Sequence, residues 1–168
     1  FFIMRVMLVI TNVVPLLVYF AVLWRLVDRL ATTDAARLYA MAAATWGTFL
    51  TTLAITMNNH LPAAICVLLT TALTLQIWWG ERRWWYFAGA GLCGAFAVAN
   101  ELPALSFFAC IAVALLWQAP RQACLAFAPA ALLVAGGFVA TNYLAHGTVV
   151  PAYAHRSDGP VVATVSRD

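Results

Sequence analysis

The sequence is poor in charge. Only 9% of its 168 residues are charged, and they comprise nine arginines, six acidic residues and no lysine. Soluble domains carry roughly a quarter charged residues, so these few charges could not cover the surface of a soluble fold. Apolar residues make up 65% of the chain, which excludes disorder. The net charge of +3 is too small to indicate a nucleic-acid partner. The composition therefore predicts an all-α polytopic membrane protein.

Common catalytic and metal-binding motifs are also missing. The chain has no P-loop, no HExxH pair and no GxSxG sequence. Four cysteines lie within apolar runs and form no CxxC pair, which predicts free, buried thiols; they are Cys66, Cys93, Cys110 and Cys124. We therefore expect no metal site and no cofactor.

Polar clusters divide the apolar sequence into six predicted transmembrane spans. A helix needs about 20 apolar residues to cross a hydrocarbon layer of about 30 Å. The spans run approximately over 6–24, 38–57, 61–79, 84–100, 102–117 and 122–142 within a membrane region of residues 1–142. Residues 143–168 are a polar tail, expected to begin a further domain at the outer face. The sequence reads as a fragment of a longer protein, because it starts without an initiator Met.

The arginines alternate between breaks and indicate an orientation. The breaks 25–37, 80–83 and 118–121 contain arginine, whereas 58–60 and 100–101 contain none. Positive charge marks the cytoplasmic side of a membrane. We therefore expect the turns at 58–60 and 100–101 to share the outer face with the tail. We expect a multi-pass protein located in the bacterial inner membrane.

Two of these turns have similar sequences. Residues 59–63 read Asn-His-Leu-Pro-Ala, and residues 100–104 read Asn-Glu-Leu-Pro-Ala. Asn is a good helix N-cap and Pro suits the first helical turn, so both turns are predicted to start helices. Two helix N-termini on one face would favour an anion such as phosphate. The alternative is that the pattern only starts helices cleanly.

His60 and Glu101 occupy the same position in the two turns, and we expect them to face each other or a common cleft. Glu101 is the single charge between Arg83 and Arg121, a stretch too long for one crossing and too short for two full spans with a loop. We expect a tight hairpin whose tip is recessed below the outer surface. An ionisable group at such depth is a candidate for function, although Glu101 could also simply complement its helix dipole.

Small residues and prolines mark packing and interruption within the spans. Gly91, Ala95 and Ala99 recur every four residues and predict close helix contact, a role also expected for Gly136-Gly137. Pro15 and Pro129 are predicted to interrupt their spans.

The organisation resembles the GT-C class of membrane glycosyltransferases, which includes protein mannosyltransferases and lipid A aminoarabinose transferases. The resemblance covers roughly residues 5–142. It is carried by the span from Arg5 to Leu26, the outer turn 56–63, the basic turn 81–85 with the glycine-rich run 88–92, and the turn 99–104.

The resemblance implies transfer of a sugar from a polyprenyl-phosphate carrier at the outer face, with membrane lipids around the enzyme and an undefined acceptor. The acidic base of the class lies in a first outer loop, expected upstream of Phe1, so no residue here takes that role. Candidate substrate-binding residues lie in the two turns and the tail: Asn58, Asn59, His60, Asn100, Glu101, His155 and Arg156. Arg156 is included because a guanidinium pairs well with phosphate.

Two alternatives stay open at this point. A transporter or permease is suggested by the repeated turns, because many transporters carry internal repeats and broken helices. A membrane protein with no catalytic role would use the same turns only to build its fold.

Overall fold

The apolar runs form helices in the computed structural model, which describes residues 2–149. Helix occupies 84% of these residues, and they contain no strand. The all-α prediction is confirmed.

Four groups of elements follow one another along the chain. A continuous first helix comprises α1 (Phe2–Leu8), the π-helical turn η1 (Val9–Val13) and α2 (Val14–Leu30). Two shorter helices follow, α3 (Asp34–Trp46) and α4 (Leu50–Leu53). The middle of the chain forms α5 (His60–Trp78), α6 (Trp84–Asn100) and α7 (Ala104–Gln118). A second long helix contains α8 (Pro120–Gln122), the π-helical turn η2 (Ala123–Phe127) and α9 (Ala128–His146).

Three helices among the described residues are long and apolar enough to cross a membrane: Phe2–Leu30, His60–Trp78 and Pro120–His146. They indicate a membrane protein, and many large apolar side chains on their outer faces are exposed, as lipid contact requires. Six spans are not confirmed. At 1.5 Å per residue, α6 and α7 are only about 25 and 22 Å long, although they form the tight hairpin predicted around Glu101.

The range 38–57 is not one continuous span. Helix α3 begins at a cap in which Thr33 accepts a hydrogen bond from Ala36 N, and it ends at Trp46. Thr48 Oγ1 donates to Ala44 O at 2.7 Å, a local bond of the kind that competes with helix continuation. The chain therefore bends at residues 47–49 before the single turn of α4.

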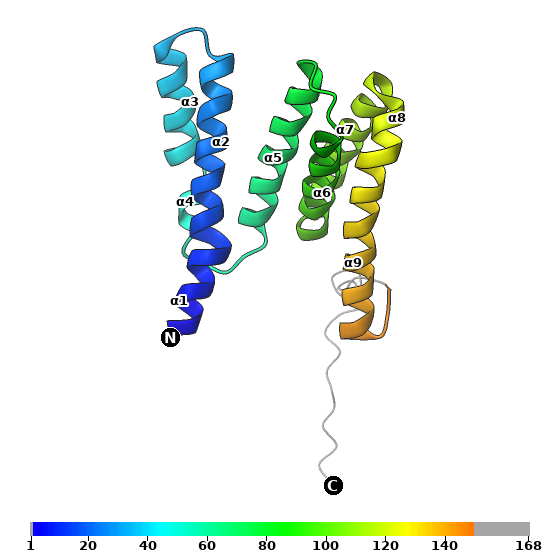
Figure 1. Ribbon diagram of the computed structural model, residues 1–168. Helices are drawn as coiled ribbons and strands as arrows, with labels where there is room; N and C mark the ends of the chain where they lie inside the picture. The colour runs from blue at the N-terminus through cyan, green and yellow to red at the C-terminus, as the bar shows by residue number, and fades with distance from the viewer. Residues whose placement is uncertain (1, 150–168) are drawn as a thin grey trace.

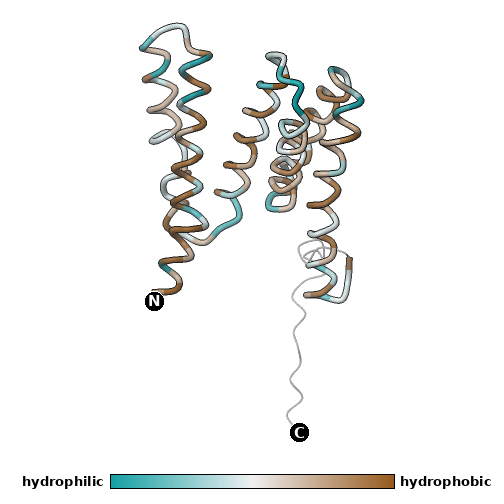
Figure 2. The backbone as a smooth tube through the Cα atoms, viewed as in Figure 1, coloured by the Kyte–Doolittle hydropathy of each residue, from teal (hydrophilic) through white to brown (hydrophobic). Residues whose placement is uncertain are grey.

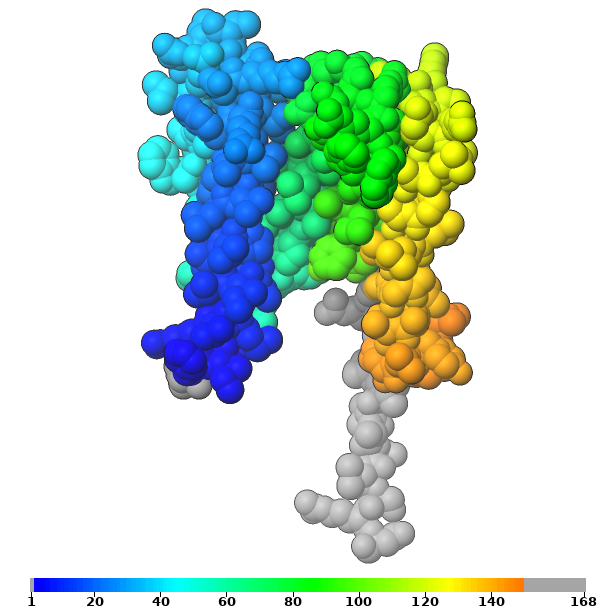
Figure 3. Space-filling view, in the orientation of Figure 1, coloured from blue at the N-terminus to red at the C-terminus, as the bar shows by residue number. Residues whose placement is uncertain are grey.

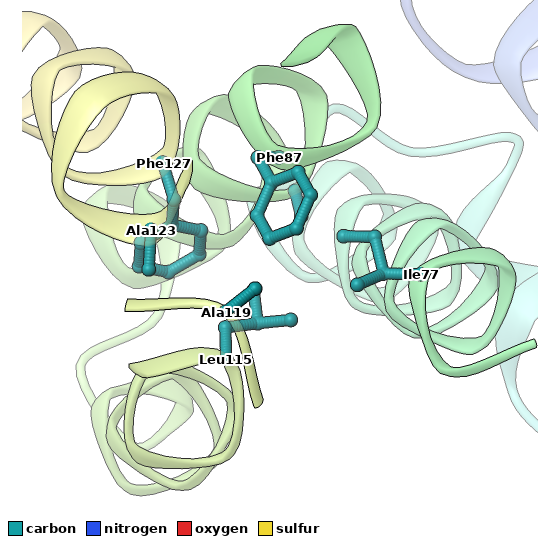
Figure 4. Packing of buried hydrophobic residues seen from close by; sticks show 7 residues of the cluster. Ile77, Phe87, Leu115, Ala119, Ala123 and Phe127 are labelled. Carbon is teal, nitrogen blue, oxygen red and sulfur yellow. The ribbon is translucent and has the colours of Figure 1, made fainter. Parts of the chain in front are cut away.

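The helices stand side by side in the order α3, α2, α5, α6 and α9, and α7 packs against α5, α6 and η2 (Figure 1). One apolar core joins α5, α6, α7 and the start of the last helix (Figure 4). It is built by Ile77, Phe87, Ala90, Leu115, Ala119, Ala123 and Phe127. A second core joins α2 to α4 and α5 and contains Leu16, Ala54, Leu61 and Ile65.

The small-residue prediction is confirmed at Gly91 and wrong at Gly136 and Gly137. A Cβ on Gly91 would lie 2.2 Å from Phe127 O, so α6 approaches the backbone of η2 at this residue. A Cβ on Gly136 or Gly137 would meet no atom within 4 Å among the described residues. The α6–η2 contact therefore depends on one glycine, and the pair in α9 has no packing role there.

Each mid-span proline is the second residue after a π-helical turn. Val14 N donates to Val9 O before Pro15, and Ala128 N donates to Ala123 O before Pro129. A proline lacks the N–H group and crowds the carbonyl four residues earlier, and the wider turn relieves that conflict. The predicted interruptions therefore take the form of π turns. The four cysteines are free, as predicted, but none is fully buried: Cys66 and Cys93 are half-buried, and Cys110 and Cys124 are exposed.

The arginine-containing breaks gather at one end of the bundle. The end of α2, the start of α3, the α5–α6 turn and α8 all lie at the upper end in Figure 1, where Figure 2 shows hydrophilic segments. Arg37 pairs there with Asp28 at 3.3 Å and with Asp34 at 2.7 Å. The turns before α5 and α7 lie at the opposite end, as the alternation of charge predicted.

Candidate functional site: the polar cluster before α5 and α7

The two repeated turns contact each other. Asn59, directly before α5, donates through Nδ2 to Asn100 O at 2.8 Å and to Glu101 Oε1 at 2.7 Å. His60 Nδ1 pairs with the same Glu101 oxygen. The prediction that His60 and Glu101 face each other is therefore confirmed. We call Asn59, His60 and Glu101 the polar cluster.

The His60 side chain of the polar cluster is exposed to solvent. The His60 side chain is 60% exposed, whereas that of Glu101 is 26% exposed. Because Nδ1 faces the carboxylate, the second ring nitrogen, Nε2, is left for a ligand or for solvent. Asn59 fixes the carboxylate from a second direction. The arrangement presents one oriented carboxylate and one imidazole, both able to bind hydroxyl groups.

The other two asparagines of the turns have structural roles. Asn58 Oδ1 accepts from Leu61 N at 2.9 Å, and its Nδ2 donates to Leu53 O at 2.8 Å. Asn58 thus caps α5, a role expected for Asn59. Asn100 lies in the last turn of α6 and donates to Phe96 O at 2.8 Å, so it ends α6 and does not cap α7.

Most amides of the two helix starts have internal partners. Ala63 N donates to Asn59 O at 3.2 Å, and Ala104 N donates to Glu101 O at 3.0 Å. Pro62 and Pro103 contribute no N–H group. Few amides are left to hold an anion, so the geometry favours the side chains of the polar cluster over the helix N-termini as the ligand-binding groups.

Asn12 supports the polar cluster and was missed by the sequence analysis. It lies in η1, is only 2% exposed, and donates through Nδ2 to Thr56 O at 2.7 Å. Longer contacts of 3.4 Å reach Leu53 O and Ala54 O. Thr56 and Ala54 belong to the non-helical segment between α4 and α5, and Leu53 is the last residue of α4. The signal in the sequence was a lone asparagine within the apolar range 6–24, three residues before a proline.

An apolar groove begins beside the polar cluster. It has a volume of about 310 Å³ and runs between α6, α7 and α9, where Ala99, Leu102 and Phe138 are among its lining residues. Ala99 and Leu102 flank Asn100 and Glu101 in the chain. Phe108, from α7, closes part of the groove and stacks on Phe127.

The polar cluster is recessed. In Figure 1, α5 and α6 stop above the lower ends of α1 and α9. Figure 3 shows the described residues leaving a hollow between α1 and the end of α9 on this side. The recess agrees with the short hairpin predicted around Glu101.

The remaining candidates lie elsewhere. His155 and Arg156 are outside the described residues, and α9 extends to His146, beyond the predicted end of its span at 142. Within residues 2–149, no group of three His, Cys, Asp or Glu side chains is placed to hold a metal ion. No protein-family model matches the chain, and no curated protein or solved structure is similar enough to count as a match.

Proposed function

We propose that this chain is part of a membrane glycosyltransferase that takes its sugar from a polyprenyl-phosphate carrier at the outer face of a bacterial inner membrane. The observation that carries the proposal is the polar cluster beside an apolar groove. A lipid-linked sugar has the same two parts, a hydroxyl-rich head and a long apolar chain. The undefined acceptor would approach from the recess.

Residues of the polar cluster and the groove would contact different parts of the donor. Glu101 would accept hydrogen bonds from sugar hydroxyls, while Asn59 holds the carboxylate in place. His60 Nε2 would contact a second hydroxyl or a phosphate oxygen. Ala99 and Leu102 would contact the first isoprene units in the groove. Hydrogen bonds to charged groups contribute about 1.5–3 kcal/mol each, enough for Glu101 to dominate recognition of the head.

The membrane orientation predicted from the arginines supports the proposal. With the arginine-rich end in the cytoplasm, the polar cluster lies at the outer face, where polyprenyl-linked donors of this class are used. The six predicted ranges would then be multi-pass membrane segments, with α3 and α4 as a broken one and α6 and α7 as a short hairpin.

A transfer assay on membranes containing the full-length protein tests the proposal. We expect Glu101→Gln to lower transfer from the polyprenyl-linked donor at least about tenfold. Ser106→Ala is the matched control, because Ser106 lies one turn into the same hairpin and bonds only to Pro103 O. Absence of transfer by the wild type with any such donor, or full transfer by Glu101→Gln, would contradict the proposal.

One observation favours the transporter as a second candidate. The chain between α4 and α5 is non-helical, and Asn12 and Asn58 both donate to Thr56 O within it. Unwound segments of this kind form substrate sites in transporters. Substrate-dependent flux into vesicles, without transfer, would support this candidate. A membrane protein with no catalytic role would instead tolerate alanine at His60, Glu101 and Arg156 together.

A further inference from the structure

A second cavity, separate from the apolar groove, lies at the arginine-rich end, away from the polar cluster. It is enclosed by α2 on one side and by α5 and α6 on the other, with a volume of about 360 Å³. Its polar lining consists of Arg25, Arg29, Gln76 and Tyr86, and the rest is mainly aliphatic. Gln76 and His60 are 16 residues apart on α5, about 24 Å along the helix. The proposed sugar-binding role does not account for this cavity.

Arg29 is held in a fixed position at the cavity. Its guanidinium lies 3.6 Å from the centre of the Trp79 ring, and Nη1 donates to Gln76 Oε1 at 3.2 Å. The cation–π contact and the hydrogen bond together restrict the guanidinium, and its other N–H groups stay available to an acceptor. Arg29 is therefore preorganised to bind an acceptor in the cavity.

Arg25 lies one helical turn before Arg29 on α2 and faces the same cavity. Among the described residues it forms no ion pair with a carboxylate, and neither does Arg29. The nearby Asp28 pairs with Arg37 instead. Two guanidinium groups thus share one cavity, and no carboxylate of residues 2–149 pairs with either of them.

Four tryptophans lie at the α5–α6 turn, at the same end as the cavity: Trp78, Trp79, Trp84 and Trp85. Because tryptophan is enriched at the membrane–water interface, we expect the cavity to lie at the depth of the lipid headgroups. Val22 and Leu69 continue the lining toward the middle of the bundle. An anion at the arginines would therefore have an apolar wall directly beneath it.

We propose that this cavity binds the phosphodiester of an anionic phospholipid from the cytoplasmic leaflet, with one acyl chain against the aliphatic wall. Two oxygens of the phosphodiester would accept from Arg25 and Arg29, since guanidinium groups match phosphate geometry. Basic pockets between membrane helices recognise anionic headgroups in this way. The bound lipid would join α2 to the α5–α6 hairpin.

Lipid-dependent thermal stability of the full-length protein tests this inference. The purified protein is unfolded in nanodiscs of phosphatidylcholine with increasing phosphatidylglycerol, and native mass spectrometry counts retained lipids. We expect phosphatidylglycerol to raise the melting temperature, and Arg25→Gln to weaken its apparent affinity by about fivefold. Arg25 suits the test because its removal breaks no internal hydrogen bond or ion pair within residues 2–149.

Arg82→Gln is the matched control, because it removes one positive charge at the same end but outside the cavity. We expect this variant to keep the phosphatidylglycerol effect, and Arg29→Lys to weaken it while retaining the charge. Equal losses in Arg25→Gln and Arg82→Gln would overturn the inference in favour of diffuse attraction. Equal stabilisation by phosphatidylcholine, or displacement of the lipid by millimolar inorganic phosphate, would also overturn it.

Discussion

At the scale of single residues, the geometry around the polar cluster depends on a buried amide. Asn12 comes from the first helix, yet it donates to the segment that leads into His60. Asn58 also donates to Thr56 O at 2.7 Å, so the contribution of Asn12 is to tie this segment to the first helix. Asn12 therefore acts on the polar cluster through the backbone and not through a ligand.

Replacing Asn12 tests this dependence. We expect Asn12→Leu to lower the free energy of unfolding by about 1–3 kcal/mol, because the first helix loses its hydrogen bond to Thr56 O and the two longer contacts to Leu53 O and Ala54 O. Thermal unfolding of the full-length protein in detergent measures the change. Thr141→Val is the control, since Thr141 is exposed and bonds only within its own helix; it should shift the melting temperature little. An Asn12→Leu protein as stable as the wild type would refute this role.

At the scale of elements, α6 approaches the backbone of η2 closely at Gly91. We expect Gly91→Ala to be strongly destabilising, because the new Cβ would lie 2.2 Å from Phe127 O and the two helices would have to separate. Gly136→Ala makes the same chemical change in open space, so it should be neutral or slightly stabilising through helix propensity. The melting temperatures of the two variants, compared in the same detergent, test whether the α6–η2 contact needs a glycine at position 91. A similar shift in both would show that the contact is unimportant.

The helices themselves were largely predictable from hydropathy. Ranges 61–79 and 84–100 match α5 and α6 within a residue or so, because polar turns with Pro or Arg end each apolar run sharply. The break in 38–57 was not predicted, since threonine bonds to the local backbone are a weak sequence signal. The cap of α5 also fell on Asn58 instead of Asn59. In a pair of adjacent asparagines, tertiary contacts decide which one turns toward the helix.

Part of the candidate site was also predictable from the sequence. The matching turns and the isolated charge of Glu101 pointed to the His60–Glu101 contact, which the structure contains. The buried Asn12 and the arginine cavity were not found, because each joins elements far apart in the sequence. Hydropathy shows which segments enter a membrane but gives little information on which of them are neighbours.

At the scale of the whole molecule, the segregation of arginines to one end predicts the orientation. In a cysteine-free full-length protein, Leu102→Cys reports on the polar-cluster end and Arg82→Cys on the arginine end. We expect a membrane-impermeant maleimide added to intact cells to label the cysteine at 102 and not the cysteine at 82 until the membrane is opened. The reverse pattern would invert the orientation and place the polar cluster in the cytoplasm.

The central claim is that Glu101 recognises the sugar of a lipid-linked donor. The most direct measurement compares binding of a polyprenyl-phosphate-linked sugar and of the bare polyprenyl phosphate to full-length protein in nanodiscs. We predict that the sugar increases affinity for the wild type and for Ser106→Ala, and that Glu101→Gln loses this increase while retaining binding of the bare carrier. Its melting temperature should change little, because partly exposed ion pairs contribute at most about 1 kcal/mol. An unchanged sugar-dependent increase in the folded Glu101→Gln protein would contradict the claim.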